Sequence, residues 1–256
     1  MKSSEAIGTQ KFTDKMEGLV HPVILNCKIQ DQEYSYFGLG TAFLLNYKGY
    51  LFAVTAQHVL NNQYASHDDL RIRLRNAPVS ITFDRHSVFQ DQSNPDPDTD
   101  LAIFRVKKSQ HGMLFAAGCK SLEATNRAET PEFGDVDFFH VWGYPDEGRE
   151  YDYQEKLLTA ELWYMGGKLT ESALPSLSTI KIESHRPSML RGMSGSMVIA
   201  DIGGKWKFAG LAILASDSQG LLSFIPSERI LYFLEKMLWT EKVGLVLPAD
   251  VHEINE

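Results

Sequence analysis

The sequence lacks most features of a disulfide-stabilised, secreted or membrane-spanning protein. It has two cysteines, Cys27 and Cys119, and no C-x-x-C pair. This fits a reducing compartment, although the sequence is also compatible with a single disulfide between them. No apolar run approaches the roughly 18 residues of a membrane helix. The first residues, MKSSEAIGTQKFTDKMEGL, lack the apolar core of a signal peptide. We therefore expect a soluble, cytoplasmic protein with no membrane partner.

Positive charge is also scarce, with 25 Lys and Arg against 33 Asp and Glu and a formal net charge of −8. A general nucleic-acid binder needs a basic stripe, so we expect no nucleic-acid partner. The eight histidines contain no H-E-x-x-H pair, and the acidic run DQSNPDPDTD lacks the spacing and glycine of a calcium loop. We expect no metal and no other cofactor.

What the chain does contain is a series of short β-rich runs separated by Gly, Asn, Asp and Pro. The first series runs from VILNCKI to LAIFRV and the second from DVDFFHVWGY to LLSFI. Such spacing without long helical patterns predicts an all-β barrel or sandwich, and 256 residues fit a single unit of that class. PSERILYFLEKML differs, because Ser227 is a good N-cap and the apolar residues that follow have helical spacing.

These patterns divide the chain into segments. We expect residues 1–18 to form a flexible arm, about 19–115 a first β half, and about 130–225 a second. The stretch 111–134 is expected to connect the two halves. A helix at about 227–239 and a tail at 240–256 complete the prediction.

The stretch LRGMSGSMVI, residues 190 to 199, places Ser194 among glycines that weaken a strand. A plain turn explains this, and so does a nucleophile whose backbone must approach a substrate. The nucleophile elbow of α/β-hydrolases does not fit, because Ser196 replaces the last glycine of G-x-S-x-G and a hairpin follows in place of a helix. His252, in the polar tail, is the only later histidine.

Two residues upstream complete a different constellation. AVTAQHVL places His58 just past an apolar strand, and DTDLAIFRV places Asp100 at the mouth of another. A serine, a histidine base and a buried carboxylate form a catalytic triad whatever their order in the chain. Taken singly, each has an ordinary structural explanation. Asp98 competes as the acid, but Asp100 directly precedes the strand, so we expect Asp98 to be a solvated turn residue.

Together these segments resemble the chymotrypsin/trypsin-like serine proteases, especially the bacterial members without disulfides. GTAFLLNYKGYLFAVTAQHV is similar to their first hairpin ending in T-A-x-H, TDLAIFRV to their D-x-A strand, and GMSGS to their nucleophile loop. SFIPSERILYFL is similar to the end of the HtrA-type catalytic domain, although no PDZ module is recognisable. The resemblance spans roughly residues 19 to 238; Ser196 and Met197 depart from the commoner glycine and proline.

The resemblance implies a chymotrypsin-like double β-barrel with a C-terminal α-helix. It assigns His58 as general base and acid, Asp100 as the residue that orients it, and Ser194 as the nucleophile. The backbone N–H groups of Gly192 and Ser194 would form the oxyanion hole, and Gly195 would permit the sharp turn that exposes the hydroxyl.

The resemblance also places the base of the primary specificity pocket at Ser188 and its wall at Ile213, Leu214 and Ala215. No acidic residue is expected there, and a neutral base with an apolar wall favours a medium-sized apolar residue before the cleaved bond. His185 and Arg186 are close enough in sequence to enter the pocket, which would favour an acidic residue instead.

The sequence therefore predicts an intracellular serine endopeptidase of the trypsin-like class, acting on a protein or peptide substrate. The alternative is a protease-like domain that serves as a non-catalytic protein-binding module. An intermediate case is a latent enzyme whose Arg191-Gly192-Met193 stretch is ordered by an activating protein partner.

Overall fold

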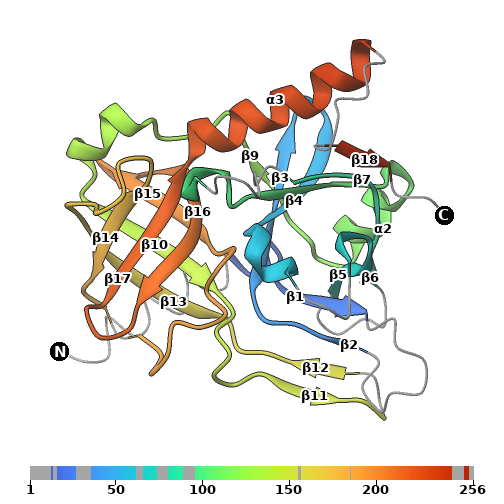
Figure 1. Ribbon diagram of the computed structural model, residues 1–256, viewed down its shortest axis with the longest axis horizontal. Helices are drawn as coiled ribbons and strands as arrows, with labels where there is room; N and C mark the ends of the chain where they lie inside the picture. The colour runs from blue at the N-terminus through green and yellow to red at the C-terminus, as the bar shows by residue number, and fades with distance from the viewer. Residues whose placement is uncertain are drawn as a thin grey trace.

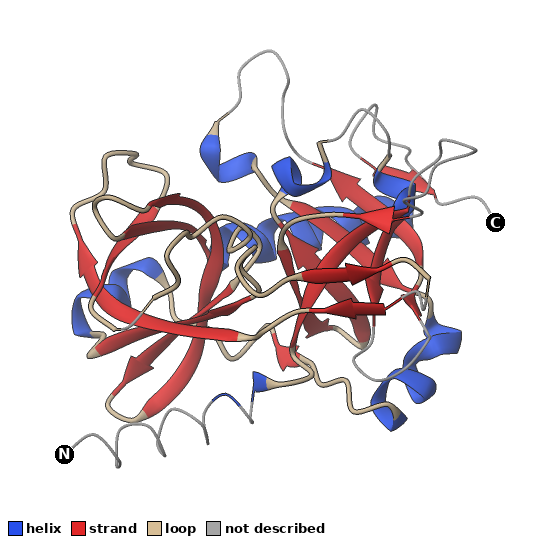
Figure 2. Cartoon of the chain, turned by 90° about the horizontal axis from the view of Figure 1, so that it is seen from below, coloured by secondary structure: helices blue, strands red, loops and turns tan. Residues whose placement is uncertain are grey.

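The computed structural model describes residues 13, 16–26, 36–61, 66–73, 80–88, 96–154, 157–184, 186–243 and 251–253. This part of the chain forms two β-rich halves side by side, and a long C-terminal helix runs across both of them (Figures 1 and 2). The prediction of an all-β architecture with one C-terminal helix is confirmed.

The elements follow the chain in order. The first half contains β1 (Val20–Asn26), β2 (Tyr36–Phe37), β3 (Thr41–Tyr47), β4 (Tyr50–Thr55), β5 (Leu70–Arg73), β6 (Ser80–Ile81), β7 (Phe83–Val88) and β8 (Ala102–Val106). The connector holds α2 (His111–Ala116) and β9 (Leu122–Glu123). The second half contains β10 (Phe138–Gly143), β11 (Glu150–Asp152), β12 (Leu157–Thr159), β13 (Trp163–Thr170), β14 (Ser178–Ile182), β15 (Met197–Ile202), β16 (Lys205–Ser216) and β17 (Leu221–Pro226), followed by α3 (Ser227–Val243) and β18 (Val251–Glu253).

The two halves differ in how far their sheets close. In the second half, β10, β13, β14, β17, β16 and β15 form a closed barrel in that order, with every neighbouring pair antiparallel. In the first half, a curled sheet has the order β18-β7-β8-β4-β3-β1-β5-β6. The hairpin of β11 and β12 extends from the second half along the first (Figure 1). The first half is called barrel one and the second barrel two below.

Strand alternation in barrel one supplies two separate apolar cores. Leu44 of β3 and Ala53 of β4 face the interior of barrel one, whereas Phe43 and Phe52 face the other way. Successive side chains of a strand point to opposite faces, so a strand buried on both faces can serve both cores. The resulting run of buried residues is why β3 and β4 show almost no polar alternation.

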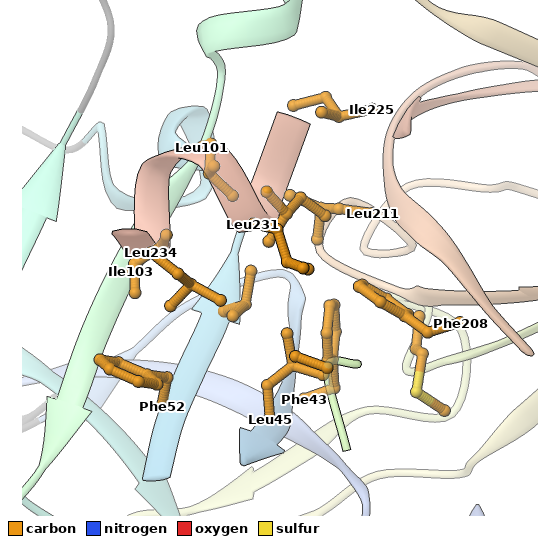
Figure 3. Close-up of a cluster of buried hydrophobic side chains, with 14 of the residues drawn as sticks. Phe43, Leu45, Phe52, Leu101, Ile103, Phe208, Leu211, Ile225, Leu231 and Leu234 are labelled. Carbon is orange, nitrogen blue, oxygen red and sulfur yellow. The ribbon is translucent and has the colours of Figure 1, made fainter. Parts of the chain in front are cut away.

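The core between the two halves is lined by both barrels and by α3, as Figure 3 shows. Phe43 of barrel one lies next to Phe208 of barrel two, Phe52 lies at the barrel-one end of the cluster, and Leu231 and Leu234 of α3 belong to the same cluster. The rings of Phe43 and Phe208 have centroids 5.5 Å apart. Fully burying one such side chain stabilises the fold by about 1.5–3 kcal/mol, so this shared core holds the two barrels in a fixed relation.

Three boundaries differ from the sequence prediction. The helix continues to Val243, four residues beyond the expected end at 239. Residues 251–253 of the expected tail form β18, which pairs antiparallel with β7. At the other terminus, Met16 is buried in the shared core, so the end of the expected flexible arm is anchored. Among the described residues, no helix is long and apolar enough to cross a membrane.

Candidate active site

The strand pairing of barrel one brings His58 and Asp100 together. β4 and β8 are antiparallel, with Thr55 opposite Ala102, so the end of β4 lies beside the start of β8. His58 follows β4 in the short 3₁₀ helix Gln57–Leu60, and Asp100 immediately precedes Leu101 and β8. Two residues 42 positions apart in the sequence therefore become neighbours.

Asp100 binds His58 through both of its carboxylate oxygens. The backbone N–H of His58 donates to Oδ1 at 2.9 Å, and ring Nδ1 lies 2.5 Å from Oδ2. The Asp100 side chain is 12% exposed, whereas the imidazole is 40% exposed. The carboxylate fixes the ring through Nδ1, and Nε2 makes no hydrogen bond to any described residue.

Asp98 does not behave as the solvated turn residue we expected. Its side chain is 16% exposed and lies 2.9 Å from Nε of Arg229, in α3. Burial raises the pKa of this carboxyl, and the nearby Arg229 opposes that rise. The expectation was wrong because the sequence does not show that α3 packs across the turn before β8. Asp98 ties this turn to the helix, and Asp100 contacts the histidine.

Gly192 and Gly195, on either side of Ser194, occupy positions where other residue types would be strained. Gly192 and Gly195 each have φ of +90°, a region that L side chains rarely adopt. A Cβ at Gly195 would lie 1.8 Å from the Thr41 carbonyl oxygen, and one at Gly192 would lie 2.8 Å from the N atom of Asp146. The glycines therefore let this segment pack tightly against barrel one and the chain after β10.

Carbonyl groups of residues 191–196, called the serine segment below, accept hydrogen bonds from residues outside the segment. The Asp146 N–H donates to the Arg191 carbonyl at 2.8 Å, Thr41 Oγ1 donates to that of Gly192 at 3.1 Å, and the Thr41 N–H donates to that of Ser194 at 2.9 Å. Thr41 Oγ1 in turn accepts the N–H of Tyr144 at 2.8 Å. These bonds fix the orientation of the peptide groups of the segment.

Some backbone N–H groups of the segment donate a hydrogen bond, and others are open, meaning that they have no acceptor among the described residues. Those of Met193, Gly195 and Ser196 donate to the carbonyls of Leu190, Ala212 and Met193. Those of Gly192 and Ser194 have no acceptor among the described residues. The two open donors are the pair that the resemblance assigns to an oxyanion hole.

The Ser194 hydroxyl lies beside an irregularity of β16. The pairing of β16 with β17 shifts between Ala212 and Leu214, leaving Ile213 as an extra residue. A bulge of this kind removes a carbonyl from the ladder, and Ser194 Oγ donates to the Ile213 carbonyl at 3.3 Å. Within the described residues, that hydroxyl makes no hydrogen bond to His58.

The residues expected at the specificity pocket are placed unevenly. Leu214 and Ala215 are exposed, but the Ile213 side chain is buried. Ser188 donates through its N–H and its hydroxyl to one carboxylate oxygen of Glu147, both at 2.8 Å. The expectation of no acidic group at Ser188 was therefore wrong, because Glu147 reaches it from 41 positions upstream.

Arg186 and His185 were the two residues expected to enter that pocket. Arg186 donates from Nη1 to the Asp217 carbonyl at 2.6 Å, and its guanidinium lies 3.6 Å from where a Cβ of Gly220 would be. It is thus engaged with the turn between β16 and β17. His185 lies outside the described residues.

Sequence reasoning missed the residues that support the serine segment. Thr41 begins β3, and Asp146 follows the Trp-Gly-Tyr-Pro run that extends from the end of β10. The proline and the Asp-Glu-Gly that follows it indicate a turn in the sequence. Nothing near Asp146 in the sequence, however, indicates its hydrogen bond to Arg191. Among the described residues, no group of three or more His, Cys, Asp or Glu is arranged to hold a metal ion.

Comparison with known proteins supports the architecture. The chain is similar to the crystal structure of the thermostable serine protease AL20 from an extremophilic microorganism, with a TM-score of 0.57 and 13% sequence identity. The match covers 84% of this chain and 94% of that one. No family model and no curated protein matches the sequence. The fold is therefore a chymotrypsin-like double barrel, with barrel two closed and barrel one a curled half-barrel.

Proposed function

We propose that this chain is a serine endopeptidase that hydrolyses peptide bonds through an acyl-enzyme formed on Ser194. The observation that carries the proposal is the doubly hydrogen-bonded pair of His58 and Asp100. The resemblance of the fold to a serine protease supports hydrolysis in general.

His58 is proposed as the general base and then the general acid. Because Asp100 accepts the Nδ1 proton, the neutral ring presents the lone pair of Nε2 to solvent and substrate. When Nε2 takes a proton, the buried carboxylate stabilises the imidazolium that forms. Asp100 itself stays ionised throughout.

The proposed reaction proceeds in two proton-balanced halves. Ser194 Oγ attacks the scissile carbonyl while its proton passes to His58 Nε2, and the tetrahedral oxyanion collapses as that proton is given to the leaving amine. A water molecule then attacks the acyl-enzyme by the same route, which releases the carboxylic acid and restores the serine. To begin, the hydroxyl must turn from the Ile213 carbonyl towards His58, an adjustment common on substrate binding.

The N–H groups of Gly192 and Ser194 are proposed to stabilise the oxyanion. They are the open donors of a segment whose carbonyls are engaged elsewhere. Preorganised donors of this kind cost no rearrangement in the transition state, and one donor contributes about 10²–10³ in turnover. The same bonds favour a segment that is formed without an activating partner, in contrast to a latent enzyme.

The proposed substrate is a protein or peptide with an apolar residue before the cleaved bond. Met189 and Leu214 offer exposed apolar surface, at 49% and 45%, and the Glu147 oxygen at Ser188 already accepts two hydrogen bonds. Peptides that differ only at this position, with Leu, Phe, Arg or Glu, test the preference. Faster cleavage after Arg would assign the specificity to Glu147 instead.

A second function is favoured by one observation. The Ser194 hydroxyl bonds to a carbonyl and not to His58, which suits a protease-like domain that binds proteins without cleaving them. Such a domain would leave the serine unreactive.

Labelling by a fluorophosphonate decides between the two, because the probe reacts only with an activated serine. Purified protein is incubated with the probe and read by intact mass, beside Ser194→Ala. Stoichiometric labelling that the variant loses supports the hydrolase. Absence of labelling in the natural protein contradicts an active hydrolase and leaves the binding domain or a latent enzyme.

A further inference from the structure

Arg149 makes an unusual set of contacts between the barrels. It stands after Gly148, just before β11, and among the described residues its guanidinium donates to four backbone carbonyls. Nη1 donates to Gly38 at 2.7 Å and Val23 at 3.2 Å, and Nη2 donates to Gly40 at 2.9 Å and Tyr144 at 3.2 Å. Three of these acceptors belong to barrel one and one to the chain after β10.

The acceptors are arranged around a close approach of the backbone. Gly38 and Gly40 have φ of +148° and +140°, and a Cβ at Gly40 would lie 2.5 Å from a methyl carbon of Val59. Their carbonyls can therefore converge on one cation. The Tyr151 hydroxyl also donates to Gly38, so β11 is attached to barrel one at two positions.

Arg149 has no carboxylate partner among the described residues. Its charge is balanced by carbonyl dipoles, and hydrogen bonds to a charged group are about twice as strong as neutral ones. A lysine has a single charged nitrogen and does not match four acceptors held in a planar fork. This chemistry suits a fixed structural clamp.

The clamp continues directly to the serine segment. Tyr144, whose carbonyl Arg149 holds, is two residues before Asp146, whose N–H binds the Arg191 carbonyl at 2.8 Å. That bond sets the orientation of the peptide between Arg191 and Gly192. If this peptide turned over, the Arg191 carbonyl would occupy the direction of the Gly192 N–H.

We propose that Arg149 is a positioning residue that holds the segment Tyr144–Asp146 against barrel one and thereby keeps the Gly192 N–H aimed at the oxyanion. The inference rests on the proposed hydrolase function. It assigns to this arginine the support of the oxyanion donors, at a distance from the reacting atoms. Arg149 makes no hydrogen bond to His58 or Asp100.

The test compares Arg149→Met and Arg149→Lys with the natural protein. Arg71→Met is the matched control, since Arg71 also donates to backbone carbonyls, those of Asp68 and Leu70, within barrel one. The rate of fluorophosphonate labelling is measured against probe concentration, to separate the maximal rate from half-saturation. Hydrogen exchange is followed in peptides covering 144–148 and 190–194.

For Arg149→Met we expect the maximal labelling rate to fall about 10- to 100-fold, below the cost of losing a whole donor. Half-saturation and the pH midpoint of labelling should stay unchanged, because the serine and histidine are untouched. Exchange should rise in both peptides. Arg149→Lys should recover part of the rate, and Arg71→Met should match the natural protein.

The inference is overturned if Arg149→Met labels within twofold of the natural protein, or if only half-saturation changes. It is also overturned if hydrogen exchange rises throughout the chain and is not confined to the two peptides. If Arg149→Met does not fold, Arg149→Lys carries the same comparison. Failure of the natural protein to label would refute the proposed function alone, since the exchange data still test the clamp.

Discussion

The backbone N–H and the ring Nδ1 of His58 bind opposite oxygens of the same Asp100 carboxylate, at 2.9 and 2.5 Å. The first bond fixes the start of the turn that carries the histidine, and the second fixes its ring. Because both depend on one carboxylate, the position of the main chain and the tautomer of the side chain are set together.

Replacing Asp100 by Asn should therefore lower the fluorophosphonate labelling rate by about 10⁴-fold. The amide can still accept one of the two donors, but it offers an N–H where the ring needs an acceptor, which favours the wrong tautomer. The measurement is the labelling rate at neutral pH. Asp98→Asn is the control and should label within a few fold, because Asp98 makes its ion pair with Arg229 and not with the histidine.

Gly192→Ala should reduce labelling by about 10²–10³-fold, the usual effect of removing an oxyanion donor. The added methyl meets the Asp146 N atom at 2.8 Å and would push the peptide out of place. Gly49→Ala provides a matched control, since Gly49 has φ of +80° with nothing within 4 Å of a built Cβ. A similar loss of labelling in both variants would mean that backbone strain, and not position, is responsible.

Arg229→Met should destabilise the fold by about 1–3 kcal/mol, because it leaves the partly buried Asp98 carboxylate without its partner. Asp98→Asn should cost less, since burial already raises the pKa of this carboxyl and opposes its charge. Urea unfolding at pH 7 measures both. The double variant should recover part of the loss; strictly additive effects would contradict a direct pair.

His21 should make the protein less stable in mild acid. Burial lowers its pKa from 6.5 to about 4, against a smaller opposing effect of its hydrogen bond to the Gly18 carbonyl. Between these values the unfolded chain binds a proton that the folded one does not, so the free energy of unfolding falls as the pH drops from 6.5 towards 4. The contribution is at most about 3 kcal/mol.

The check is urea unfolding at several pH values for the natural protein and His21→Asn. The variant retains a donor for Gly18 and removes the titrating ring, so its stability should decline less steeply below pH 6.5. Burial lowers the pKa of His140 in the same direction, so part of the slope should remain. An unchanged slope in the variant would contradict the assignment.

The strands and the C-terminal helix were predictable because local signals specify them. Alternating or continuous apolar runs bounded by turn residues gave β3, β4 and β8 nearly as observed. The helix N-cap at Ser227 was also predicted, although the helix begins with Ser227 itself and ends at Val243. What was missed at the termini, the burial of Met16 and the pairing of β18, depends on surfaces formed by distant parts of the chain.

The sequence by itself determined which side chains were candidates for chemistry, because a histidine, a carboxylate and a glycine-flanked serine are recognisable as residue types. Only the tertiary structure showed that the two carboxylates of one turn have different partners: Asp98 pairs with Arg229 of α3, and Asp100 binds His58. It also brought Thr41, Asp146 and Arg149 to the serine segment. Their contacts are to backbone groups, which every residue carries, so no pattern in the sequence marks the partner.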